Sequence, residues 1–211
     1  MAFNSSYSNI QSISARPLAN KTVLVTRSVG QSSQFTRYLQ AQGAQVIEMP
    51  ALEIGPPTSW QALDQAIAQL ASFDWLILTS ANGVDFFLDR LALQAQAASA
   101  LARVKIAVVG KKTAASLNQR GIKPDFTPPN FVADSLLEHF PERDRLSRQK
   151  ILFPRVETGG RAVLVDDFRA QGAEVIEVAA YESRCPEAIA PLALAVDADG
   201  VHLGQQDMPV A

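Results

Sequence analysis

Apolar runs separated by polar, helix-like segments recur along most of the chain, and the first such unit returns near the end. Residues 21–53 read KTVLVTRSVGQSSQFTRYLQAQGAQVIEMPALE, and residues 149–182 read QKILFPRVETGGRAVLVDDFRAQGAEVIEVAAYE. In both copies a β-branched apolar run ends at an arginine, a polar turn follows, glycine stops an amphipathic helix, and a second apolar run returns. Each copy therefore predicts a strand, a helix and a second strand.

A different module, residues 74–128, lies between the copies. Its apolar runs WLIL and IAVV each open into a helical pattern. The pattern further predicts a helix after Thr58, which stands at capping-box spacing from Gln61. The other predicted elements are strands at 23–26 and 46–49 and helices at 31–42, 113–120 and 135–140. Strands that alternate with helices through short crossovers predict an α/β fold with parallel sheets covered on both faces.

Composition limits the function classes. The chain has 211 residues, 47% of them hydrophobic, which suffices for a substantial core. A net charge of −2 gives no reason to expect nucleic acid or an anionic membrane as a partner. One cysteine and two histidines cannot supply a disulfide framework or a metal cluster. No run approaches the roughly 20 apolar residues that span a bilayer. Residues 1–20, rich in serine and asparagine, are predicted to be a disordered tail.

Four turns between a strand and the following helix are candidate binding sites. Ligands of parallel α/β folds lie beyond the carboxyl ends of the strands. The turns at 27–30, 79–82, 110–113 and 155–160 consist of small, hydroxylated or basic residues at helix N-termini, where free N–H groups favour anions. These turns predict a ligand with several carboxylates or phosphates. Phosphate alone is the weaker interpretation, because neither GxxxxGK[ST] nor GxGxxG occurs.

Each of these residues also has a purely structural interpretation. Thr, Ser, Asn and Gly at such turns are first of all capping residues. Lys111 and Lys112 at an exposed turn are by default solvated charges, and Arg27 and Arg155 can satisfy carbonyls at strand ends. Tyr181, after an apolar strand, is by default a tyrosine at the edge of a core. The occurrence of four such turns in two modules favours the functional interpretation.

Several segments, in this order, resemble bacterial uroporphyrinogen-III synthase over residues 21–186: VLVTR, DWLILTSANGVDFFL, IAVVGKKTA, LNQRGIKPDF, ILFPR and GAEVIEVAAYES. The resemblance implies two interleaved α/β parallel-sheet domains, joined by a pair of extended strands, with the active site in the cleft between them. It also implies closure of the linear octacarboxylate tetrapyrrole hydroxymethylbilane to uroporphyrinogen III, with loss of water and inversion of the terminal ring. Neither metal nor cofactor is implied, and a cytoplasmic monomer is expected.

The resemblance also assigns site residues. Tyr181 matches the family's tyrosine near the cleft and is the candidate acid, because a phenol keeps its proton at neutral pH and can donate it to the leaving hydroxyl. The candidate groups for holding substrate carboxylates are Thr79, Ser80, Asn82, Gly110 and Thr113, with Arg27 and Arg155 as further candidates. Correct placement of the linear tetrapyrrole should contribute most to the rate, since an unguided tetrapyrrole closes to the wrong isomer.

By the same resemblance, residues 21–50 are the first half of one domain, 51–183 are a complete second domain, and 184–211 do not match. The segment ALAVDADGVHLGQQDMP resembles a fragment of thiamine-phosphate synthase, in which Asp207 would match a carboxylate beside magnesium diphosphate; His202 lies in the same segment. Three functions follow: the synthase, with little product expected from this chain alone; a non-catalytic module that binds polycarboxylate tetrapyrroles; and, remotely, thiamine-phosphate synthesis.

Overall fold

The computed structural model describes residues 16–28, 33–94, 97–130, 132–160, 163–186, 196–197 and 200–201. The chain divides into two compact units, one formed by residues 1–53 with 185–211 and the other by Ile54–Arg184. Most of the predicted tail, residues 1–15, lies outside the described residues, and the chain forms a turn at 17–20. Within the described ranges, no helix has the length and apolar character needed to cross a bilayer.

The first unit contains the predicted strand, helix and strand. β1 (Thr22–Val25) and β2 (Gln45–Glu48) pair in parallel, and α1 (Ser33–Ala41) lies between them in the sequence. Gly43 follows α1 with a φ of +93°, and a Cβ at this position would lie 2.9 Å from the Cβ of Arg16. Glycine is therefore needed both for the left-handed turn and for the close approach of the chain. β8 (Val196–Asp197) and β9 (Gly200–Val201) form a separate antiparallel pair.

The second unit contains one five-stranded sheet with the strand order β3-β7-β6-β4-β5. Its strands are β3 (Glu53–Gly55), β4 (Trp75–Leu78), β5 (Lys105–Val108), β6 (Lys150–Val156) and β7 (Glu174–Arg184). Its helices are α2 (Gln61–Ala68), α3 (Ala81–Ala92), α4 (Ala97–Leu101), α5 (Lys111–Gln119), α6 (Ala133–Glu138) and α7 (Val163–Ala170), with 3-10 turns η1 (Leu70–Ser72) and η2 (Arg143–Arg148). β4 pairs in parallel with β5 and β6, and β6 pairs in parallel with β7.

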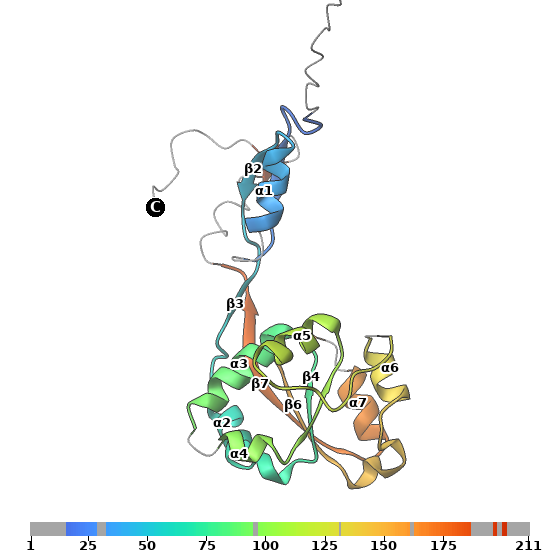
Figure 1. The fold of residues 1–211 in the computed structure, drawn as a ribbon. Helices are drawn as coiled ribbons and strands as arrows, with labels where there is room; N and C mark the ends of the chain where they lie inside the picture. Colours follow the sequence, from blue (N-terminus) through green and yellow to red (C-terminus); the bar gives the residue numbers. More distant parts are fainter. Residues whose placement is uncertain are drawn as a thin grey trace, which may run out of the picture. The chain divides into compact units, whose positions relative to one another are not determined.

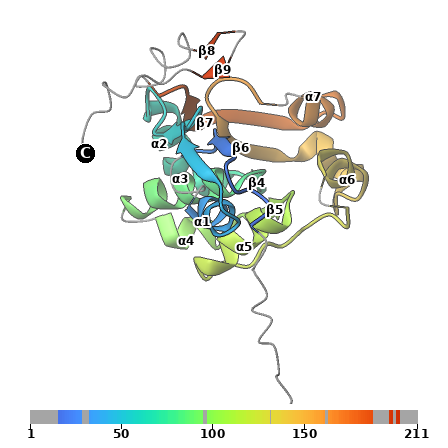
Figure 2. The same ribbon diagram turned by 90° about the horizontal axis from the view of Figure 1, so that it is seen from above.

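Two apolar cores cover the two faces of this sheet. On one face, side chains of α2, α3 and α5 pack on β4, β5, β6 and β7, with Leu63, Phe87 and Leu117 fully buried. On the other face, α6 and α7 pack on the same sheet around Trp75 and Phe168. Figure 1 shows α2 and α3 on one side of the strands and α6 and α7 on the other, and Figure 2 gives the same arrangement from above. The predicted α/β fold with a parallel sheet covered on both faces is therefore confirmed.

The chain leaves β4 and β6, which are neighbours, in opposite directions. From β4 it passes through α3 to β5 on one side, and from β6 it passes through α7 to β7 on the other side. Because α3 and α7 cover opposite faces of the sheet, the carboxyl ends of β4 and β6 form a topological switch point. In open α/β sheets this is the place where a crevice opens for a ligand.

One local prediction is wrong. Thr58 does not cap α2, whose N-cap is Trp60 and has no side-chain cap. Thr58 instead donates its N–H, at 2.8 Å, and its hydroxyl to the Glu157 carboxylate. These bonds lower the pKa of the Glu157 carboxyl below its ordinary value. Thr58 thus connects the loop before α2 to the loop after β6 instead of capping the helix.

Candidate functional site

Ser80 and Tyr181 meet at the carboxyl end of the sheet. Ser80 is the N-cap of α3, and its Oγ accepts the Gly83 N–H at 2.9 Å. The same Oγ lies 3.1 Å from the Tyr181 Oη, and either oxygen can be the donor. A Cβ on Gly83 would lie 3.1 Å from Ser80 Oγ and 3.8 Å from Tyr181 Cε1. Glycine in the first turn of α3 therefore leaves room for the serine and the tyrosine ring.

A β-bulge decides which way Tyr181 faces. Arg155 pairs with Ala179, but the next residue, Val156, pairs with Tyr181, so that Ala180 is the extra residue. Strict alternation along β7 would place Tyr181 on the same face as Val175, in the core under α6 and α7. With the bulge, Ala180 and Tyr181 both pack on the side of α2 and α3. The irregular backbone thus brings the phenol to Ser80.

A cavity of about 230 Å³ opens beside this pair. Thr79 after β4, Arg155 at the end of β6 and Tyr181 on β7 all line it. The other lining residues are Val109, Ala133, Phe153, Val156, Gly160 and Leu164. Three of the residues predicted for the site, contributed by β6, β7 and the turn after β4, therefore meet at the switch point between β4 and β6.

Arg155 is largely occupied by contacts within its own unit. Its Nη1 donates to Glu177 Oε2 at 2.6 Å, and its Nη2 donates to the Gly159 carbonyl at 2.7 Å. Glu177 also forms an ion pair with Arg169, with 3.0 Å between Glu177 Oε1 and Arg169 Nη1. A Cβ on Gly160, where φ is +79°, would lie 3.0 Å from Arg155 Nη2. The arginine therefore holds the turn at 157–160 in place, with its side chain only 16% exposed.

The remaining predicted residues lie at two helix N-termini and in the first unit. Asn82 is in the first turn of α3, and Gly110 is the N-cap of α5 without a side-chain cap. Thr113, in the first turn of α5, is buried. None of these three is among the described residues that line the cavity. Arg27 belongs to the first unit, where its guanidinium lies 5.8 Å from the centre of the Phe35 ring.

Two aromatic residues beside Tyr181 were not predicted as part of the site. The ring centres of Tyr181 and Phe86 are 6.0 Å apart, and those of Phe86 and Trp60 are 6.5 Å apart, with both pairs stacked. In the sequence, Trp60 belongs to the apolar stripe of a helix, and Phe86 adjoins one. Since the stack joins α2, α3 and β7, no local pattern could have identified it.

No group of three or more His, Cys, Asp or Glu side chains that could hold a metal ion occurs among the described residues. His202 and Asp207, the residues of the resemblance to thiamine-phosphate synthase, lie outside those residues. The cavity at the switch point thus offers the Tyr181 phenol, the Thr79 hydroxyl and the Arg155 guanidinium. These groups can donate protons and hydrogen bonds to an anionic ligand.

Comparisons with known proteins agree with one another. A uroporphyrinogen-III synthase from Synechococcus elongatus is 56% identical over 174 residues, which are 82% of this chain and 65% of that protein. One from Chlorobaculum parvum is 30% identical over 169 residues, 79% of this chain and 65% of that protein. The chain thus spans about 65% of the length of these curated relatives.

A crystal structure of a mutant uroporphyrinogen III synthase from Thermus thermophilus shares the fold. Its TM-score is 0.60 at 18% identity, and the match covers 83% of this chain and 68% of that one. The family model of uroporphyrinogen-III synthase HemD matches residues 33–200. That match extends beyond Pro186, where the sequence resemblance ended, and reaches into the segment that resembles thiamine-phosphate synthase. The chain belongs to the uroporphyrinogen-III synthase family.

Proposed function

We propose that this chain closes hydroxymethylbilane to uroporphyrinogen III, with loss of water and inversion of the terminal ring, and that Tyr181 is the acid. The observation that carries the proposal is the 3.1 Å contact between Tyr181 Oη and Ser80 Oγ beside a cavity at the topological switch point. Both curated relatives named above support it, since each is a uroporphyrinogen-III synthase. We further propose that the enzyme is a cytoplasmic monomer.

The hydrogen bonds around Ser80 suit Tyr181 for proton donation. Ser80 Oγ accepts the Gly83 N–H in the first turn of α3, so the serine proton is free to point at Tyr181 Oη. Tyr181 can then direct its own proton at the leaving hydroxyl, which departs as water. The phenolate that forms is stabilised by the serine hydroxyl and by the positive end of α3.

The surrounding groups would orient the substrate. Thr79 and Arg155 in the cavity, and Asn82, Gly110 and Thr113 at the N-termini of α3 and α5, can donate hydrogen bonds to substrate carboxylates. Arg27 is a further proposed contact. Because ring closure needs the terminal ring in one orientation, positioning should supply much of the acceleration, on the order of 7–11 kcal/mol in favourable cases.

Tyr181→Phe tests the proposal. The chain is incubated with freshly prepared hydroxymethylbilane, and isomers III and I are separated. The phenylalanine variant should form isomer III at least ~100-fold more slowly than the parent chain, with tetrapyrrole binding nearly unchanged, because only proton donation is lost.

Tyr38→Phe, in the first unit, is the matched control and should leave the rate unchanged. Tight tetrapyrrole binding accompanied only by isomer I would select the non-catalytic module instead. Robust formation of isomer III by the parent chain would show that the expectation of little product, drawn from the sequence, is wrong.

A further inference from the structure

Three stacked rings run from the proposed acid to the start of α2. Tyr181 comes from β7, Phe86 from α3, and Trp60 is the N-cap of α2. The interplanar angles are 23° between Tyr181 and Phe86 and 30° between Phe86 and Trp60. All three residues are half-buried, and Trp60 and Tyr181 pack against the core under α2 and α3. The rings therefore form one continuous support for the tyrosine.

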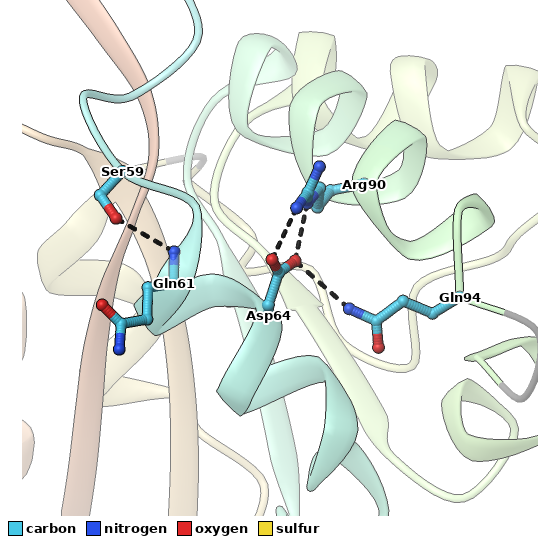
Figure 3. Close-up of polar contacts among 5 residues, drawn as sticks. All are labelled: Ser59, Gln61, Asp64, Arg90 and Gln94. Carbon is cyan, nitrogen blue, oxygen red and sulfur yellow. Dashed lines mark hydrogen bonds and ion pairs between the residues drawn. The ribbon is translucent and has the colours of Figure 1, made fainter.

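An ion pair holds the far end of the stack. The Arg90 guanidinium lies 4.8 Å from the centre of the Trp60 ring. Its Nε donates to Asp64 Oδ1 at 2.7 Å and its Nη2 donates to Asp64 Oδ2 at 2.6 Å (Figure 3). Gln94 Nε2 donates to the same carboxylate at 3.3 Å. A bidentate pair fixes the plane of the guanidinium, and that plane lies against the tryptophan.

Residue spacing explains why these contacts form together. Trp60 and Asp64 are four residues apart at the start of α2, and Phe86, Arg90 and Gln94 follow one another at four-residue steps along α3 and just past its end. Side chains four apart lie on one face of a helix. The two faces meet, so that one ring pair and one ion pair join α2 to α3.

We propose that Phe86 and Trp60 are positioning residues for Tyr181, and that the pair of Asp64 with Arg90 holds Trp60 in place. Rotation of a phenol ring turns its O–H bond, which prefers the ring plane, while the oxygen stays nearly where it was. Ser80 fixes the oxygen, and the stacked rings fix the plane. The direction in which the proton is offered thus depends on both. This inference rests on the proposed role of Tyr181 as the acid.

The test uses the full chain with 13C-labelled tyrosine, and the ring signals of Tyr181 are assigned by their loss in Tyr181→Phe. Phe86→Leu keeps an apolar side chain but removes the ring. It should move the Tyr181 ring signals and lower kcat for isomer III roughly tenfold, with KM little changed. Arg90→Gln should have the same effects to a smaller extent. Phe86→Tyr, which keeps a ring, should restore both the signals and kcat.

Arg120→Gln is the matched control. Arg120 is also paired with aspartates of α3, Asp85 and Asp89, and neither ion pair includes a member of the stack. It should move neither the Tyr181 signals nor kcat. If Phe86→Leu remains folded and leaves the Tyr181 signals or kcat unchanged while Tyr181→Phe is impaired, the positioning role is wrong. If Tyr181→Phe itself retains full activity, the proposed function of Tyr181 fails, whatever the ring signals show.

Discussion

The hydroxyl oxygen of Ser80 makes two contacts, one within α3 and one with β7. It caps α3 through the Gly83 N–H and contacts the Tyr181 hydroxyl. Ser80→Ala removes both bonds, and loss of an N-cap side chain should lower the free energy of unfolding by about 1 kcal/mol. Urea denaturation measures this change. Ser72→Ala, which removes an exposed bond to the Gln69 carbonyl, should cost at most about 0.5 kcal/mol. Equal losses in the two variants would show that the Ser80 cap contributes no more to stability than an exposed side-chain hydrogen bond.

At the residue scale, the sequence predicted several residues that line the cavity, but it did not predict the contact partner of each. Thr79, Arg155 and Tyr181 were expected at strand ends, and they line one cavity. The partner of Tyr181 was not predictable, because a bulge with its extra residue at Ala180 reverses the face given by the two-residue period. Nor was the pairing of Arg155 with Glu177, since it depends on the alignment of β6 with β7.

At the element scale, the contact between α2 and α3 should depend on pH. Hydrogen bonds from Arg90 are the main cause that lowers the pKa of the Asp64 carboxyl below its ordinary value of 3.8. A lowered pKa in the folded state means that the stabilisation is complete well above pH 3.8 and is lost as the pH falls through the folded-state value. Asp64→Asn should therefore cost roughly 0.5 kcal/mol near neutral pH, because the pair is partly exposed, and less in acid.

Chemical denaturation of the parent and Asp64→Asn at a series of pH values measures that difference. In an Arg90→Gln background, Asp64→Asn should lose most of its pH-dependent effect, because the partner that lowers the pKa is gone. A cost that is the same at neutral and acidic pH, or one that survives in this background, would contradict the assignment.

Strongly apolar elements were predictable, and short elements without an apolar pattern were not. The strand at 75–78 was predicted with the bounds that β4 has, because four consecutive buried side chains leave little ambiguity. β3 has three residues and is defined by its position beside β7, which lies far along the chain. α4 has five residues in an alanine-rich segment without an apolar stripe. For such elements, partners distant in the sequence decide the structure.

At the scale of the whole molecule, the two units should differ in stability. Among the described residues of the first unit, only Val25, Thr36 and Ala44 are buried, whereas both cores of the sheet lie in Ile54–Arg184. Limited proteolysis with chymotrypsin should therefore cut early near residues 50–57, at Leu52, which is 46% exposed and lies just before β3. Mass spectrometry of the early fragments identifies the site.

The fragment 54–184, produced alone, should unfold cooperatively with a midpoint close to that of the main transition of the full chain, because it contains its own core. Protection of residues 21–49 equal to that of residues 74–128 would contradict this view. So would a fragment that fails to unfold cooperatively.

The bulge at Arg155 and Val156 makes the chemistry of the cavity depend on how many residues β7 contains before its end. If β7 ran with strict alternation, the residue facing α2 and α3 after Ala180 would be Glu182, and Tyr181 would turn away. A carboxylate would then replace the phenol beside Ser80. It would carry no proton to donate at neutral pH, and it would repel the proposed substrate, which is a polyanion. A single backbone irregularity thus decides whether a neutral proton donor or a negative charge lies beside Ser80.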